Sequence, residues 1–199
     1  MKKTAWISAV TVLTMLATGC GNSATTSPAN IANQTSSVNV TGKTPSVSTN
    51  GHGGLIVGGE AYQGQENLAK YEKDADAHPS DANAQIQAAI SAYVNGDMQK
   101  AISYYKKAIS DDPKNPVPYN NLGNVYFRGL KQPKEALPYY QKATQVDPSY
   151  AYGWLNLGLC QLQLGDKSAA KAAFQQGLSK TSKNDPLYKA FQDNLKKLG

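Results

Sequence analysis

A repeated pattern in the second half of the sequence constrains the fold more than any other feature. One copy consists of Trp154, Leu157, Gly158, Ala170 and Phe174. The same skeleton occurs 34 or 35 residues earlier as Tyr119, Leu122, Gly123, Ala136 and Tyr140. Prolines recur at the same period, at Pro79, Pro113 and Pro148. A period of this length is typical of a two-helix unit that buries its apolar stripe only by stacking on its neighbours.

The period divides the chain into three units, residues 82–115, 116–150 and 151–184. The first unit departs from the pattern, with Gln85 in the aromatic position and Ala89 in place of the glycine. The second unit carries one extra residue, which we place in the turn at residues 129–132. The pattern resembles the tetratricopeptide repeat (TPR). This resemblance implies an all-α solenoid of antiparallel helix pairs, and an unrelated helical bundle with chance periodicity is the alternative. We expect Trp154 to be largely buried.

Residues 60–199 form the predicted repeat domain, with an additional helix at each end. From about residue 60 to residue 77, Leu68, Tyr71 and Ala75 fall at helical spacing, which indicates half a repeat in front of the stack. The last helix, within residues 185–198, has Tyr188, Phe191 and Leu195 on one face, as a capping helix requires. Pro138 falls one turn into the second helix of the second unit, so we expect that helix to start late or to kink.

The first 19 residues have the features of a secretory signal peptide. Two lysines precede a short apolar run, and Gly19 and Cys20 follow it. The run is too short to span a membrane. The sequence Leu16-Ala17-Thr18-Gly19-Cys20 resembles a bacterial lipobox, which implies a lipidated Cys20 and a cell-membrane anchor on the extracytoplasmic face. Ordinary secretion with cleavage elsewhere is the alternative.

Residues 20–59 have a different composition from the rest of the chain. They are rich in Ser, Thr, Asn and Gly and carry one charged residue before position 60, Lys43. Such a segment buries too little apolar surface to offset its ordering entropy, so we predict a disordered tether. Within it, the apolar residues 55–57 either dock on the first helix or form an exposed patch, and we favour docking.

The remaining residue types argue against several functional classes. Cys160 lies inside a helix of the buried kind, which favours a core position, and no metal-ligand spacing is present. His52 and His78 stand without evident partners. The domain carries interspersed charges, so we expect no nucleic-acid partner. With no nucleophile motif, phosphate loop or paired ligands, we predict no enzyme, no cofactor and no small-molecule substrate.

The TPR resemblance also implies a partner-binding groove on the first helix of each unit. Carried over position by position, the groove residues are Asn83, Ile86, Ile90, Tyr93, Asn120, Asn121, Asn124, Phe127, Tyr152, Leu155, Asn156 and Leu159. The basic residues with which some family members bind chaperone C-termini are missing, because the corresponding positions hold Ile, Asn and Leu. An apolar groove with a central asparagine patch suits an extended peptide, since an amide both donates and accepts. We expect that packing alone gives no reason for asparagine at Asn120 and Asn124.

These observations lead to two functional hypotheses. The first is a non-catalytic, membrane-anchored lipoprotein scaffold that binds a segment of a partner protein in the groove. The alternative is a structural assembly or pilot factor for a membrane or cell-envelope complex, acting through its convex face or by oligomerising. A monomeric domain favours the first hypothesis and a stable oligomer favours the second.

Overall fold

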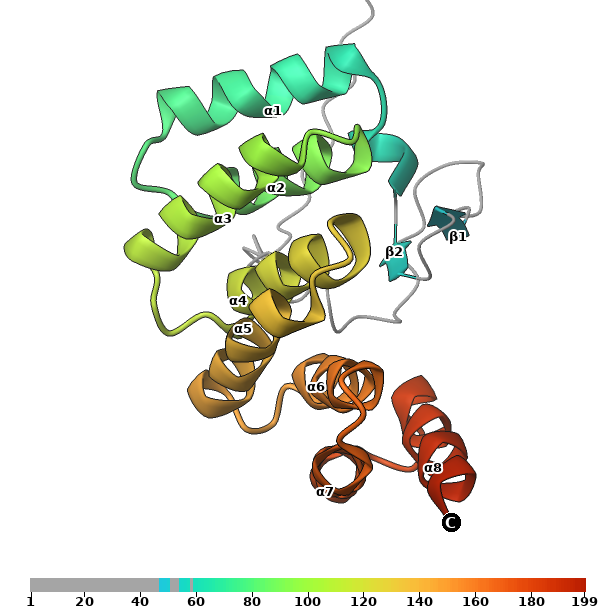
Figure 1. Cartoon of the computed structure of the whole chain (residues 1–199). Helices are drawn as coiled ribbons and strands as arrows, with labels where there is room; N and C mark the ends of the chain where they lie inside the picture. Colours follow the sequence, from blue (N-terminus) through green and yellow to red (C-terminus); the bar gives the residue numbers. More distant parts are fainter. Residues whose placement is uncertain (1–46, 51–53, 58) are drawn as a thin grey trace, which may run out of the picture.

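The computed structural model describes residues 47–50, 54–57 and 59–199, and its helices follow one another as a stack from α1 to α8 (Figure 1). The α helices are α1 Gln65–Ala77, α2 Ala82–Val94, α3 Met98–Asp111, α4 Pro116–Asn124, α5 Pro133–Val146, α6 Ala151–Gln163, α7 Lys167–Lys180 and α8 Pro186–Leu198. Two shorter turns are the 3-10 helix η2, Gly59–Tyr62, and the π-helix η3, Val125–Gly129. The predicted all-α solenoid is confirmed. The predicted signal peptide and Cys20 lie outside the described residues.

The helices pair as the repeat pattern predicts. Helices α2 and α3, α4 and α5, and α6 and α7 form the three hairpins, while α1 packs on α2 and α8 packs on α7. Helices α4 and α8 are each capped by a short polar side chain that stands directly before a proline. Asn115 Oδ1 accepts from the Val117 amide at 3.0 Å, and Asp185 Oδ1 accepts from the Leu187 amide at 2.8 Å. Each cap satisfies a donor at the open end of its helix, where the proline itself needs none.

A β-hairpin precedes the helices, and it corrects part of the tether prediction. Strand β1, Val47–Asn50, pairs antiparallel with β2, Gly54–Val57, so that Val47 lies opposite Val57. These residues were predicted to be disordered from the composition of the whole segment. Locally, however, β-branched side chains favour a pleated strand. The expected docking of residues 55–57 on the first helix stays a prediction.

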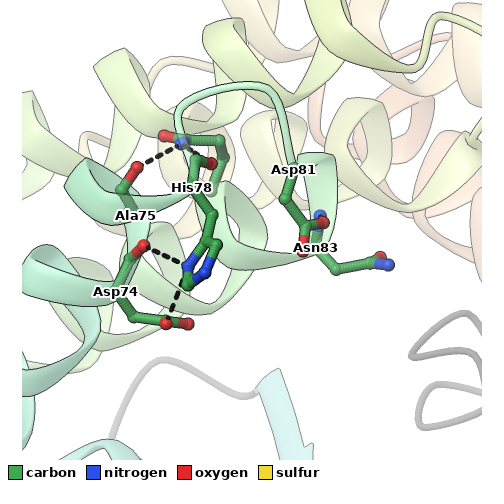
Figure 2. Close-up of polar contacts among 6 residues, drawn as sticks. Asp74, Ala75, His78, Asp81 and Asn83 are labelled. Carbon is green, nitrogen blue, oxygen red and sulfur yellow. Dashed lines mark hydrogen bonds and ion pairs between the residues drawn. The ribbon is translucent and has the colours of Figure 1, made fainter.

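The connection between α1 and α2 accounts for Gln85 in the first repeat and for the surroundings of His78 before it (Figure 2). Gln85 is fully buried, and its Nε2 donates to the carbonyl oxygen of Ala75 at 2.9 Å, near the end of α1. An amide at this position therefore ties α2 to the preceding half repeat. His78 was expected to lack partners, but its Nδ1 lies 3.0 Å from the Asp74 carbonyl oxygen and 3.1 Å from the carboxylate. This is an exposed contact across one helical turn.

Inside the second and the third hairpin, an aromatic ring of the second helix packs directly against a glycine of the first helix. A Cβ atom on Gly123 would lie 2.6 Å from the ring of Tyr140, and one on Gly158 would lie 2.3 Å from the ring of Phe174. Both rings are fully buried. Real Cβ atoms do not approach other atoms so closely, so these positions need glycine for the two helices to meet.

Three further expectations concern single residues. Trp154 packs against two core clusters but is not fully buried, and its Nε1 donates to the Pro148 carbonyl at 2.8 Å. The indole N–H points to the loop between α5 and α6, because the N–H group of a packed Trp usually finds a hydrogen-bond partner. Cys160 is fully buried, as predicted. Helix α5 begins at Pro133 and includes Pro138, so it does not start late.

Candidate functional site

The predicted groove residues lie on α2, α4, η3 and α6, and we call this surface the A-helix face. Most of its side chains are half-buried, namely Asn83, Ile90, Tyr93, Asn121, Asn124, Phe127, Tyr152, Leu155 and Leu159. Three are almost fully buried, namely Ile86, Asn120 and Asn156. The surface available to a partner is therefore smaller than the sequence pattern alone suggests.

A hydrogen bond between two buried amides joins the second and third repeats. Asn156 on α6 donates through Nδ2 to Asn120 Oδ1 on α4 at 2.9 Å. Asn120 in turn donates to Asn121 Oδ1 at 3.2 Å. Burying an amide without a partner is costly, and this pairing offsets that cost. The expectation that packing gives no reason for Asn120 is therefore wrong, while the role of these amides in binding stays a prediction.

Arg128 extends this row of amides along the A-helix face. Its Nη2 donates to Asn156 Oδ1 at 3.2 Å, and its Nε lies 3.5 Å from Asn124 Oδ1. The guanidinium also lies over the Phe127 ring, 5.8 Å from its centroid. Contacts to amides on two successive first helices hold the Arg128 side chain across the junction between the second and third repeats.

Two buried tyrosines, Tyr140 and Tyr105, form hydrogen bonds with amides of the A-helix face. The Tyr140 hydroxyl donates to Asn124 Oδ1 at 2.9 Å. Burial raises the pKa of Tyr140 far above its usual range, and the positive charge of Arg128 offsets this in part. Burial likewise raises the pKa of Tyr105, and a hydrogen bond with Asn121 partly opposes that shift. Both hydroxyls therefore stay protonated at neutral pH, and that of Tyr140 acts as a donor.

The extra residue of the second repeat was predicted to sit in the turn at residues 129–132. The structure places a wider helical turn just before it. The Leu130 amide donates to the Val125 carbonyl at 2.9 Å, five residues back, and the Gln132 amide donates to the Tyr126 carbonyl at 2.8 Å. Such π-turns commonly mark functional positions. Here the π-turn carries Phe127 and Arg128.

A small pocket opens beside this turn. It has a volume of about 210 Å³ and is lined by Phe127, Arg128, Lys131, Pro133 and Gln163. The sequence analysis assigned only Phe127 to the site. Arg128 could have been found, because it is the single arginine of the chain among 20 basic residues. Gln163 could not, because nothing in the sequence places it near residues 127–133.

The third repeat contributes a different kind of surface. Leu155 and Leu159 pack against the core cluster that contains Phe174 and Phe191, the latter on α8. Part of each leucine side chain is therefore covered at the C-terminal end of the stack. Within the described residues, His, Cys, Asp and Glu form no group of three that could hold a metal ion. None of the described helices is long and apolar enough to cross a membrane.

Comparison with known families agrees with the geometry. Residues 91–128 match a model described as TPR repeat, and residues 128–195 match one described as tetratricopeptide repeat. The chain contains tetratricopeptide repeats. The matched TPR residues include α3 to α7 and most of α8.

Several proteins with curated descriptions are similar over about half of this chain. A heat shock protein sti1 homolog of Schizosaccharomyces pombe is 33% identical over 97 residues, which are 49% of this chain and 16% of the relative. An Hsp70-Hsp90 organizing protein of Triticum aestivum is 31% identical over 116 residues, 58% of this chain and 19% of the relative. The similarity thus covers about half of this chain and a minor part of each relative.

Solved structures share the fold. The crystal structure of MamA has a TM-score of 0.58 at 20% identity and covers 66% of this chain and 74% of that chain. The Sgt2 TPR domain from Aspergillus fumigatus has a TM-score of 0.53 at 26% identity, covering 59% and 76%. The first TPR of Spaghetti (RPAP3), bound to HSP90 peptide SRMEEVD, has a TM-score of 0.53 at 25% identity, covering 59% and 91%.

Proposed function

We propose that this protein is a non-catalytic TPR scaffold that binds an extended segment of a partner protein along the A-helix face. The observation that supports this most is the polar row formed by Asn124, Arg128 and Asn156 on a surface that also presents Ile, Leu and aromatic side chains. Peptide N–H and C=O groups need such polar partners when they are removed from water. The apolar neighbours suit the side chains of the bound segment.

The proposed partner is a protein segment that differs from the HSP90 peptide of the Spaghetti structure. The Spaghetti TPR was solved with an HSP90 peptide, which supports peptide binding by this kind of surface. In the present chain the positions that the resemblance assigns to a basic chaperone clamp hold Ile86 and Ile90 in the first repeat. The second and third repeats hold Asn and Leu there. We therefore propose a partner other than a chaperone C-terminus.

The second part of the proposal is the location. The signal-peptide pattern and the lipobox resemblance support a lipid anchor on Cys20 at the extracytoplasmic face of the cell membrane, with residues 21–59 as the tether. Two acyl chains are sufficient for stable attachment. Cys20→Ser should release the protein from the membrane fraction or leave it unprocessed. A variant that fractionates like the parent, with a mature-length N-terminus, would show that the anchor lies elsewhere.

The test of partner binding compares Asn124→Ala with Tyr140→Phe. The chain serves first as bait to capture the partner, and titration calorimetry then measures the affinity. Both variants break the hydrogen bond between Asn124 and Tyr140, but only Asn124→Ala removes the amide from the A-helix face. We expect Asn124→Ala to weaken binding by about 1–3 kcal/mol and Tyr140→Phe to leave the affinity near wild type. Equal affinities for all three proteins would place the binding surface elsewhere.

A second candidate function is that of an assembly factor for a membrane or cell-envelope complex. It is favoured by the pairing of Asn120 with Asn156, which uses two of the predicted groove amides inside the protein. In this case the outer helices α3, α5 and α7, or contacts between copies, would carry the interaction. The size of the protein in solution separates the two candidates, because a stable oligomer favours assembly and a monomer favours the scaffold.

A further inference from the structure

The segment that leads into α1 is bound to the first repeat through its backbone. The Tyr62 carbonyl oxygen accepts hydrogen bonds from Ser91 Oγ at 2.8 Å and from Asn95 Nδ2 at 2.9 Å. Two residues later, the Gly64 amide donates to Asn95 Oδ1 at 2.8 Å. One asparagine amide thus pairs with a carbonyl group and an N–H group of the same segment. Such a pairing recognises main chain, which every protein segment has.

Three side chains form the surface that holds this segment, and we call it the Asn95 site: Tyr71 on α1, Ser91 on α2, and Asn95 at the end of α2. The Tyr62 ring stacks on the Tyr71 ring, with 5.0 Å between the ring centroids. Ser91 is fully buried, and Asn95 Nδ2 also donates to the Ser91 carbonyl oxygen at 2.8 Å. The Asn95 amide is therefore oriented by its own helix, so it loses little freedom when a segment binds.

The second hydrogen-bonded residue of the segment has to be a glycine. Gly64 has a φ of 90° and a ψ of 153°, a combination that residues with a side chain rarely adopt. A Cβ atom at this position would meet nothing within 4 Å, so the requirement comes from the backbone conformation and not from lack of space. The Asn95 site thus fits an aromatic residue that is followed two positions later by glycine.

The contacts that hold residues 62–64 are of a kind that water can replace. They include three hydrogen bonds between neutral groups and one pair of stacked rings. A neutral hydrogen bond contributes little net free energy, because both of its groups bond to water after they separate. Loss of one such bond corresponds to about fivefold in the ratio of bound to released segment.

We propose that the Asn95 site is a second peptide-binding site of this protein, and that a partner segment with an aromatic residue and a glycine two positions later competes for it with the chain's own residues 62–64. The proposal rests on the scaffold function proposed above and names one kind of segment that the scaffold accepts. Binding of the partner segment would also release residues 59–64 from the first repeat.

A peptide from this chain tests the site without an identified partner. The probe is the acetylated and amidated peptide of residues 60–65, Glu-Ala-Tyr-Gln-Gly-Gln. It is added to the full wild-type chain and to a full chain that carries both Tyr62→Ala and Gly64→Ala. This double variant weakens the chain's own segment and leaves the Asn95 site intact. Nuclear magnetic resonance follows the side-chain amide signals of Asn95, and circular dichroism verifies that the helices are kept.

We expect the probe to shift the Asn95 signals saturably in the double variant. It should bind about tenfold or more weakly to the wild-type chain, because a tethered segment competes at a high effective concentration. Two altered probes are matched controls for the glycine. A probe with D-alanine at the position of Gly64 should bind about as well as the original, because a D residue favours positive φ. A probe with L-alanine there should bind about fivefold or more weakly.

Two variants of the chain test the asparagine itself. Asn95→Ala, added to the double variant and followed through the Ser91 amide signal, should weaken probe binding by about tenfold or more, because two hydrogen bonds are lost. Asn194→Ala is the matched control, since its Nδ2 donates only to the Ala190 carbonyl of its own helix among the bonds described. It should leave probe binding unchanged.

Four outcomes would overturn the inference: equal binding of the probe to both chains, binding to neither, equal binding of the D- and L-alanine probes, or unchanged binding in Asn95→Ala. The scaffold function fails separately, because its test is Asn124→Ala. If the probe binds as expected and a captured partner is insensitive to Asn124→Ala, the Asn95 site stands and the scaffold function falls. If the partner requires Asn124 and the probe does not bind, the scaffold function stands and the Asn95 site falls.

Discussion

The A-helix face of the second repeat differs in chemistry from those of the first and third. At equivalent positions the first repeat has Ile86 and Ile90, and the third has Leu155 and Leu159, whereas the second has Asn120 and Asn124. The apolar residues of the outer repeats pack against core clusters. Asn120 accepts a hydrogen bond from Asn156 across the junction with the third repeat, and Asn124 accepts hydrogen bonds from Arg128 and Tyr140 within the second repeat. One helical scaffold thus presents an apolar surface at both ends and a hydrogen-bonding surface between them.

The difference shows that the same repeat position can serve stability or recognition. An isoleucine or leucine stabilises the fold by burying apolar area, and this interaction has no preferred direction. An amide contributes only when its donors and acceptors are matched, so it fixes the relative placement of its partners. The junction between the second and third repeats is therefore the part of the protein in which substitutions should have the most specific effects.

The largest expected effect concerns the apolar interior that supports both kinds of surface. Leu122 in α4 is fully buried, so Leu122→Ala should lower the free energy of unfolding by about 2–5 kcal/mol. Trp154→Ala should cost less, because the indole is half-buried and bonds to a loop carbonyl. Chemical denaturation followed by circular dichroism measures both. A larger loss in Trp154→Ala would contradict the packing described for the third repeat.

An intermediate effect is expected at the buried amide pair. Asn156→Ala leaves the Asn120 carbonyl oxygen without its donor, which should cost about 1–3 kcal/mol of stability. Replacing both residues by leucine removes both polar groups and makes the second repeat resemble its neighbours. The double variant should recover much of the lost stability, as measured by thermal unfolding. If the double variant is less stable than Asn156→Ala, the bonds of these amides to Asn121 and Arg128 contribute to stability as much as the pairing does.

The double leucine variant also tests recognition. It removes Asn156 as an acceptor for Arg128, so it should weaken partner binding even where stability has recovered. Titration calorimetry with the captured partner provides the measurement. Wild-type affinity in the double variant would mean that the polar character of the central repeat serves stability alone.

The smallest expected effect concerns Cys160, which lies behind the same junction. Its Sγ contacts the Pro133 carbonyl at 3.1 Å, and burial raises the pKa of the thiol to about 11. Because the thiolate is the reactive form, alkylation of Cys160 should be slow at pH 8 and should keep rising with pH toward 11. Mass spectrometry of the labelled peptide follows this. Rapid labelling at pH 8 would show that the junction opens.

The sequence was sufficient to predict the fold because the repeat period is a property of whole helices. Prolines, caps and the pairing of Gly158 with Phe174 all recur at fixed spacing, and each has a local physical cause. The site was less predictable. Position in the repeat places Asn120 and Asn156 on successive helices, but it does not reveal that their side chains bond to each other. The π-turn that presents Arg128 also breaks the regular spacing on which the prediction relied.

The most direct test of the proposed function is amide hydrogen exchange of the full chain with and without the captured partner. The backbone amides of α4, η3 and α6 should gain the most protection, because the bound segment would lie along the amides and Arg128 there. The outer helices α5 and α7 should change little. Protection concentrated on α3, α5 and α7, with α4 and α6 unchanged, would contradict the scaffold account and favour the assembly factor.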